Sequence, residues 1–364
     1  MQKILFRCDS SKQIGSGHIM RCLNIAKELE KRGCEITFIC RENDEDLTKL
    51  IESKYTLIKL PKLIYNSDKV LSNSFLGCDE SIDSIDTVNS IIKADIKVFN
   101  WLVIDHYGIS HIWQEIFKSE YAKSNGKSNE FKILVIDDLF DRKHICDILV
   151  DQNFLKNEDR YNNLVPNNCL KLIGPKYAIL GDEYVKKNKK SIKRDNINRI
   201  LIFFGGADKH NITKFVIDCI RDKKYNKLIF EVVIGSQNSN RNKINSEIKN
   251  IKNINLYKSL PSLAPLIEKS DFAIGACGSV IWERICLGLP SLVITFGKDQ
   301  LPIAKALHEE KYIYFLGEYK NITKIDFDKA FEKCILERNS FNKSRNLVDG
   351  LGKRRIVNAI FGTN

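Results

Sequence analysis

The segment Ile14-Gly15-Ser16-Gly17-His18 places a histidine directly after a glycine-rich turn, where a short strand has ended and a helix begins. Glycine permits a tight turn and a close approach of backbone to ligand. The first turn of a helix carries partial positive charge, which disfavours a second proton on an imidazole. His18 is therefore a candidate general base, although it could instead only cap the helix. The third glycine of the dinucleotide-binding pattern is absent, so NAD binding is not expected.

A second polar group, Asp105-His106-Tyr107-Gly108, follows an apolar strand. Parallel sheets bind ligands just past the carboxyl ends of their strands. Asp105 and His106 could alternatively serve only to hold their loop by hydrogen bonds. The pair Asp137-Asp138 follows the next strand; it could bind substrate, but we interpret it as a cap for the residues that follow. The candidate substrate-binding residues are Asp9, Ser10, Gly17, Asp105 and Tyr107.

A third group begins with Gly275-Ala276-Cys277-Gly278-Ser279, a small-residue loop between a strand and a helix. Backbone N–H groups and a hydroxyl in such a loop could bind a diphosphate. Glu283 lies one turn further on the same side, where a carboxylate could accept both hydroxyls of a ribose. The alternative is a packing turn in which Glu283 pairs with a nearby base. The candidate nucleotide-binding residues are Gly205, Gly206, Gly278, Ser279, Glu283 and Gln300.

The sequence gives no reason to expect a metal or another cofactor. Enzymes of nucleotide sugars that need a divalent ion usually carry two aspartates, one residue apart, at a strand end. Asp44-Glu45-Asp46 and Asp326-Phe327-Asp328 match that spacing, but both lie in charged, helix-like surroundings. We interpret them as solvated faces. The loop 296–300, which includes Lys298, is a further expected rim of the nucleotide pocket.

These groups are joined by alternating strand and helix patterns. A strand at 3–7, a helix at 18–32 closed by Gly33 and a strand at 35–40 form a βαβ unit, which implies a parallel, doubly wound sheet. The polar, lysine-rich stretch 181–198 then separates two such sets. Further strands are expected at 101–104, 132–136, 148–150, 170–173, 199–204, 229–234, 254–256, 272–274 and 291–294. The predicted fold is therefore α/β, with two Rossmann-like domains, 1–185 and 186–364, facing a cleft.

Composition excludes several classes of protein. A hydrophobic content of 43% with 29% charged residues is globular, and no apolar run approaches the ~20 residues that span a bilayer. The N-terminal residues do not form a secretory signal, so a cytoplasmic location without membrane insertion is expected. The eleven scattered cysteines have no metal-ligand spacing and are interpreted as reduced thiols.

The formal net charge of +12 raises the possibility of nucleic-acid binding. No nucleic-acid motif or interleaved aromatic residue accompanies it, so we do not expect nucleic acid as a partner. A positive potential would help to attract an anionic nucleotide. The one basic cluster is Lys186, Lys187, Lys189, Lys190, Lys193 and Arg194, in the expected interdomain linker.

Taken in order, FRCDSSKQIGSGHIMRCLNIA, VIDHYGIS, VIDDLFDRKHICDILVDQN, FFGGAD and GACGSVIWERICLGLPSLVI resemble the UDP-sugar hydrolases of pseudaminic acid biosynthesis. The resemblance runs from about residue 3 to residue 310 and is less marked at 56–100, which we expect to be helix and loop. It implies the two-domain architecture of GT-B glycosyltransferases. Cys277 departs from the glycine or serine expected in its loop.

The resemblance implies that His18 activates a water that attacks the anomeric carbon of a UDP-linked 2,4-diacetamido-2,4,6-trideoxy sugar, with inversion. It places Tyr107 near the sugar, Glu283 on the ribose and Ser279 at the phosphates. An inverting glycosyltransferase with a UDP-amino-sugar donor remains the alternative. No carboxylate pair supports an epimerase. A last helix after Asp349-Gly350 could pack back on the first domain.

Overall fold

The computed structural model of the 364-residue chain describes residues 1–11, 14–44, 46–63, 75–125, 130–188, 194, 196–297, 299–337 and 346–363. Some residues of the sequence predictions lie outside these ranges. They are Lys12 and Gln13 of the first segment, Glu45 of one acidic triplet, 64–74 of the stretch 56–100, Lys298 of the loop at 296–300, and Lys189, Lys190 and Lys193 of the basic cluster.

The chain divides into two compact units. Unit 1 comprises Met1–Gln152, Asn157–Ile179 and Lys353–Asn364, and unit 2 comprises Asn153–Lys156 and Leu180–Gly352. The main change of unit therefore falls after Ile179, a few residues before the expected boundary near residue 185.

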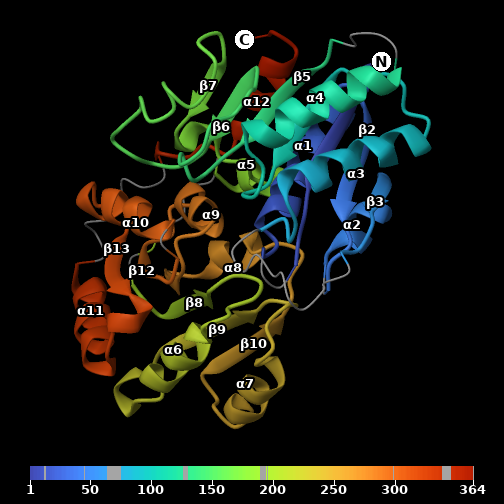
Figure 1. Cartoon of the computed structure of the whole chain (residues 1–364). Helices are drawn as coiled ribbons and strands as arrows, with labels where there is room; N and C mark the ends of the chain where they lie inside the picture. The colour runs from blue at the N-terminus through green and yellow to red at the C-terminus, as the bar shows by residue number, and fades with distance from the viewer. Residues whose placement is uncertain are drawn as a thin grey trace. The chain divides into compact units, whose positions relative to one another are not determined.

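Unit 1 is built on a seven-stranded parallel sheet with the order β3-β2-β1-β4-β5-β6-β7 (Figure 1). Most of its strands are runs of buried residues, as expected for a parallel sheet covered on both faces. The strands are β1 (Lys3–Cys8), β2 (Glu35–Arg41), β3 (Thr56–Leu60), β4 (Trp101–Asp105), β5 (Lys132–Ile136), β6 (Ile148–Asp151) and β7 (Leu170–Ile173).

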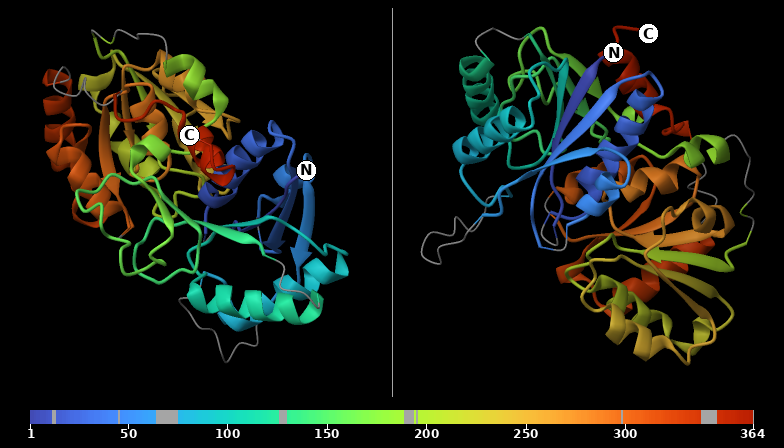
Figure 2. Two further views of the ribbon diagram at one scale, coloured as in Figure 1. Left: turned by 90° about the horizontal axis from the view of Figure 1, so that it is seen from above. Right: turned by 90° about the vertical axis from the view of Figure 1, so that its right-hand side faces the viewer.

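Alternate residues of these strands face two apolar clusters, one on each side of the sheet. On one side Ile4 and Phe6 pack with α1 (Gly17–Glu30) and α12 (Gly352–Ile360). Figure 2 shows α12, in red, beside the blue α1. On the other side the sheet packs with α3 (Glu80–Lys93) and α4 (His111–Asn125), which lie against each other.

Unit 2 is a six-stranded parallel sheet with the order β10-β9-β8-β11-β12-β13. Its strands are β8 (Arg199–Phe203), β9 (Ile229–Ile234), β10 (Ile254–Lys258), β11 (Phe272–Gly275), β12 (Ser291–Thr295) and β13 (Tyr314–Glu318). The helices of the chain not yet given are α2 (Thr48–Glu52), α5 (Asp182–Asn188), α6 (Ile212–Ile220), α7 (Arg241–Ile248), α8 (Ala264–Lys269), α9 (Val280–Cys286), α10 (Gln300–Glu309) and α11 (Lys324–Leu336). Two doubly wound parallel sheets confirm the predicted α/β class.

The interpretation of residues 56–100 as helix and loop is wrong at its start, because Thr56–Leu60 forms β3. Only Leu60 of this edge strand is buried, so the strand lacks the continuous apolar run by which its neighbours are recognised. The same reason applies to β13, whose residues are half-buried or exposed. Both unpredicted strands are sheet edges.

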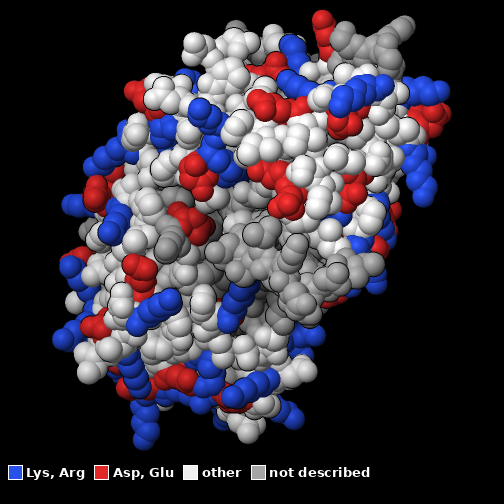
Figure 3. Space-filling view, viewed as in Figure 1, with Lys and Arg blue, Asp and Glu red and all other residues white. Residues whose placement is uncertain are grey.

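Charges of both signs are interspersed on the face shown in Figure 3. Two described members of the basic cluster have local partners: Lys187 pairs with Glu268, and Arg194 donates to the backbone carbonyls of Ile267, Ser270, Leu287 and Gly288. Within the described residues, no helix combines the length and the apolarity that crossing a membrane would require.

Candidate active site

His18 is the second residue of α1, and its side chain is buried. Its Nδ1 lies 2.6 Å from Oδ1 of Asp105, the last residue of β4. Because an ionised carboxylate only accepts, we assign the hydrogen to Nδ1. No described residue makes a hydrogen bond with Nε2 of His18, which therefore presents a lone pair. This is the arrangement of a general base oriented by a carboxylate.

Asp105 is fully buried, and a bidentate arginine holds its charge. Arg21, three residues after His18 on the same face of α1, donates from Nε and Nη2 to the two oxygens of Asp105 at 2.9 and 2.7 Å. Burial acts to raise the pKa of Asp105, but the positive charge of Arg21 and the hydrogen bonds from His18 and Arg21 outweigh it and lower that pKa. Asp105 therefore stays ionised with both oxygens occupied. It positions His18, and its contact with the sugar stays a prediction.

Tyr107 and Asp138 complete the group of side chains that contact His18 or its partners. Arg21 Nη1 donates to Oδ2 of Asp138, and the hydroxyl of Tyr107 donates to the same oxygen at 3.1 Å. The ring of Tyr107 packs edge-on against the imidazole of His18, with centroids 4.5 Å apart. We call His18, Arg21, Asp105, Tyr107 and Asp138 the His18 cluster.

Sheet topology explains why residues so distant in sequence meet. The His18 cluster follows β1, β4 and β5, which are adjacent in the sheet. The chain leaves β1 for β2 on one side, while β4 lies on the other, so β1 and β4 form the switch point where doubly wound sheets bind ligands. Gly15, at φ +85°, turns the chain between β1 and α1, and its N–H donates to the carbonyl of Ser11. Gly17 then begins the helix.

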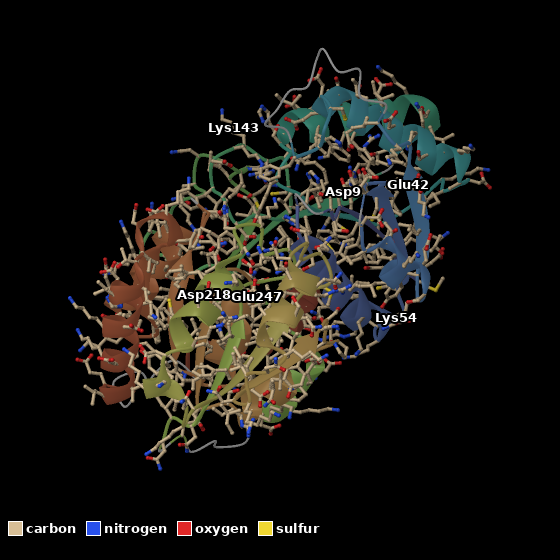
Figure 4. All side chains as sticks on the ribbon, turned by 90° about the horizontal axis from the view of Figure 1, so that it is seen from below. Asp9, Glu42, Lys54, Lys143, Asp218 and Glu247 are labelled. Carbon is tan, nitrogen blue, oxygen red and sulfur yellow. The ribbon has the colours of Figure 1, made fainter. Side chains whose placement is uncertain are left out.

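Asp9 and Ser10, predicted to bind sugar, are used inside unit 1. Oδ1 of Asp9 accepts from Arg7 Nη1 at 2.6 Å and from the N–H of Arg41 at 2.7 Å, and its Oδ2 lies 3.2 Å from His106 Nε2. Oγ of Ser10 accepts from the N–H of Leu47. Figure 4 labels Asp9 among the packed side chains of unit 1. Both residues are buried and have these partners within unit 1, so we interpret them as structural, and their contact with the sugar stays a prediction.

The Asp9 carboxylate belongs to a larger buried ion network. Asp83 of α3 accepts from Arg7 and Arg41 and from the indole N–H of Trp113. Burial acts to raise the pKa of Asp83, but the charge of Arg7 outweighs it and lowers that pKa. The network joins the ends of β1 and β2 to α3, and it holds the loop that leads to His18.

In the Asp137-Asp138 pair, the expected capping role falls to Asp137 alone. Its Oδ2 accepts from the N–H of Phe140 at 3.0 Å and from the hydroxyl of Tyr161 at 3.0 Å. Asp138 joins the His18 cluster instead. Two sequence signals could have identified the further members of the cluster. Asp138 follows a strand that neighbours β4, and Arg21 lies three residues after His18 on the same helix.

In unit 2, Gly278 and Ser279 follow β11, and β8 and β11 form the equivalent switch point. Gly278 is exposed, and a Cβ there would meet no atom within 4 Å. Ser279 precedes α9 without using its hydroxyl as a cap. Cys277 points inward and is buried. Burial raises the pKa of its thiol to about 12, so the residue behaves as a small apolar side chain.

The sequence left open that Glu283 pairs with a basic residue, but its hydrogen-bond partner in the structure is a tyrosine. The hydroxyl of Tyr184, on α5, donates to Oε2 of Glu283. Burial raises the pKa of Glu283 to about 7, although this hydrogen bond acts to lower it. Tyr184 fixes one oxygen of the carboxyl group. The interaction lies wholly within unit 2.

The remaining predicted nucleotide residues also lie at carboxyl ends of strands in unit 2. Gly205, at φ +95°, and Gly206 follow β8, and a Cβ on Gly235 would be 2.1 Å from the carbonyl oxygen of Gly206. Gln300 begins α10 after β12, and its buried Oε1 has no hydrogen-bond partner among the described residues. The same holds for the hydroxyl of Thr295 at the end of β12.

The described residues contain no group of three or more His, Cys, Asp or Glu arranged to hold a metal ion. Asp326 completes a capping box with Thr323 at the start of α11. Asp44 pairs with Lys62, and Asp46 accepts from the N–H and hydroxyl of Thr48. These aspartates have local roles.

Two doubly wound parallel α/β units are the architecture of the GT-B enzymes. Residues 200–358 match the family model described as "Glycosyltransferase family 28 C-terminal domain". Among solved structures, MurG of Acinetobacter baumannii is similar over 100% of both chains, with a TM-score of 0.65 and 10% sequence identity. That likeness shows the fold.

Curated relatives narrow the class. The chain is 28% identical over 310 residues to the UDP-2,4-diacetamido-2,4,6-trideoxy-beta-L-altropyranose hydrolase of Campylobacter jejuni, covering 85% of this chain and 97% of that protein. It is 26% identical to an uncharacterized protein of Methanocaldococcus jannaschii, of which it spans 66% of the length. The resemblance to the UDP-sugar hydrolases is therefore confirmed. Fold and relatives together support a nucleotide-sugar enzyme of the GT-B type.

Proposed function

We propose that this protein hydrolyses the anomeric C–O bond of a UDP-linked 2,4-diacetamido-2,4,6-trideoxy sugar, releasing UDP and the free sugar for pseudaminic acid synthesis. The observation that carries the proposal is the imidazole of His18, with Nδ1 on Asp105 and Nε2 without a partner among the described residues. The Campylobacter relative, named as such a hydrolase, supports the choice of substrate.

In the proposed reaction, Nε2 of His18 takes a proton from a water as the water oxygen attacks the anomeric carbon. The bond from that carbon to the β-phosphate oxygen breaks, and its electron pair leaves with UDP. Asp105 stabilises the imidazolium that forms, and Arg21 keeps Asp105 ionised and in place. A single displacement inverts the anomeric configuration. One positioned base contributes about 10²–10⁴ in rate.

The contacts of Tyr107 support a role for this side chain beside the sugar. Its ring packs on His18 and its hydroxyl is held by Asp138, so the ring cannot rotate freely. In unit 2 we propose that Glu283 accepts the ribose hydroxyls and that Ser279 and the N–H of Gly278 contact the diphosphate. Gly205, Gly206 and Gln300 are proposed to complete the nucleotide pocket.

The test is incubation of the protein with UDP-2,4-diacetamido-2,4,6-trideoxy-β-L-altropyranose, with and without EDTA, with UDP and the new anomer followed by NMR. We expect free sugar of inverted configuration and UDP in equal amounts, at the same rate with EDTA. UDP release that requires an added alcohol would instead identify a glycosyltransferase.

A matched pair of variants tests the base. His18→Ala should lower kcat by about 10²–10⁴ while UDP binding is retained. His308→Ala, at an exposed histidine of unit 2, should leave kcat unchanged. Near-normal turnover by His18→Ala would overturn the assignment.

A further inference from the structure

Arg284 of α9 is a buried arginine directly beneath the loop 275–279 of unit 2, and it is 2% exposed. Its Nη2 donates to the backbone carbonyl of Ala276. A Cβ on Gly275 would lie 2.4 Å from its Nη1, so the guanidinium occupies the space that a side chain at this position would need. The absence of a side chain at Gly275 therefore lets Arg284 reach the loop from below.

Arg284 differs from the buried arginines of unit 1 in what balances its positive charge. Arg7, Arg21 and Arg41 each form ion pairs with aspartate. Among the described residues Arg284 forms no ion pair, its one hydrogen bond goes to Ala276, and its Nε has no partner. A buried charge without a counter-charge is unfavourable, so such a residue indicates that a ligand supplies the missing charge.

The ionisable groups that act on Arg284 confirm this imbalance. Burial lowers the pKa of Arg284 to about 10, against the opposing influence of Cys277 and Glu283. Burial also raises the pKa of the Cys277 thiol and of Glu283, to about 12 and about 7. Cys277 is therefore neutral near pH 7 and Glu283 is only partly ionised, so neither provides a full counter-charge.

Resting on the proposed function, we infer that Arg284 is the fixed cation that balances the diphosphate of UDP at the loop 275–279. No residue of this loop has a charged side chain, so the loop itself offers the diphosphate only dipoles. When the anomeric C–O bond breaks, its electron pair passes to the β-phosphate oxygen. Arg284 transfers no proton in this step. It stabilises the added negative charge and holds the carbonyl of Ala276, which makes it a positioning residue.

The test compares Arg284→Gln, which keeps a hydrogen-bond donor without charge, with Arg284→Lys, which keeps the charge. Calorimetry measures binding of UDP and of uridine to each full-length variant, and the Tm without ligand is recorded. We expect Arg284→Gln to lose about tenfold to a hundredfold in UDP affinity, to bind uridine within about threefold of the parent protein, and to keep or raise its Tm. Arg284→Lys should retain most of the preference for UDP over uridine.

Arg194→Gln is the matched control, because Arg194 lies in the same unit and donates to backbone carbonyls. It should lower the Tm and leave the ratio of UDP to uridine affinity unchanged. The inference is overturned if the Gln and Lys variants of Arg284 show the same ratio, or if Arg284→Gln loses both ligands equally with a lower Tm. If the parent protein does not prefer UDP to uridine, the proposed function itself fails, which is a different result.

Discussion

Replacing Asp105 by asparagine tests whether the carboxylate orients His18 and stabilises its imidazolium. The side-chain shape is kept, but the negative charge that accepts the hydrogen bond from Nδ1 at 2.6 Å is lost. A carboxylate and an imidazolium with centres about 4 Å apart interact by about 4 kcal/mol at an effective dielectric constant of ~20. Losing most of this in the transition state corresponds to a fall in kcat of about 10²–10³.

The assay is steady-state release of UDP by Asp105→Asn, normalised to the folded fraction measured by circular dichroism. Normalisation matters because the change also removes a buried partner of Arg21, which should cost about 3–5 kcal/mol of stability. Asp138→Asn is the matched control, since Asp138 also accepts from Arg21, whereas Nδ1 of His18 lies against Asp105. Its kcat should fall less than about tenfold.

The double variant His18→Ala/Asp105→Asn provides the sharper criterion. If Asp105 acts through His18, the double variant should be no slower than His18→Ala alone, because residues that act as a unit are not additive. Two results would refute the reasoning: a folded Asp105→Asn that keeps a third or more of the parent kcat, or losses that multiply in the double variant.

Three other changes test separate parts of the structure. UDP affinity should rise about tenfold between pH 6 and pH 8, because Glu283, whose pKa is raised to about 7, must lose its proton to accept both ribose hydroxyls. Glu283→Gln should remove the part of this pH dependence that exceeds the titration of UDP itself. Calorimetry at several pH values checks both expectations. Asp83→Asn should destabilise the protein by about 3–5 kcal/mol, since it leaves Arg7 and Arg41 short of a counter-charge, and urea unfolding measures this. Ser279→Ala should weaken UDP binding about threefold to tenfold with an unchanged Tm, because its hydroxyl does not cap α9; a lower Tm with unchanged binding would contradict this.

Much of the fold could be predicted because parallel strands buried on both faces are continuous apolar runs. Such runs identified the inner strands of both sheets within a residue or two. The edge strands β3 and β13 were not recognised, and few of their residues are buried. The edge strands β7 and β10 are equally exposed but were predicted, so edge position alone does not explain the difference.

For the candidate site, the sequence indicated which strand ends carry reactive side chains, but it did not indicate the hydrogen-bond partners of those side chains. His18 and Asp105 were both singled out, yet their hydrogen bond spans 87 positions and depends on the adjacency of β1 and β4. For Asp9, a polar residue after a strand does not reveal that Arg7 and Arg41 donate to its carboxylate. Arg284 escaped notice because a lone arginine on an apolar helix gives no sign of its missing counter-charge.

The place of α12 in unit 1 has a consequence for synthesis of the chain. Ile356, Val357 and Ile360 belong to the apolar cluster that also contains Ile4 and Phe6, although more than 340 positions separate them. During translation, therefore, the sheet of unit 1 and α1 are made first, but the part of this apolar face that α12 covers remains exposed until that helix leaves the ribosome. Unit 2, whose residues lie almost entirely between the two parts, can be completed earlier. A fragment ending near residue 180 would expose this part of the face to solvent, and a peptide of residues 346–363 supplied separately is the segment that would cover it.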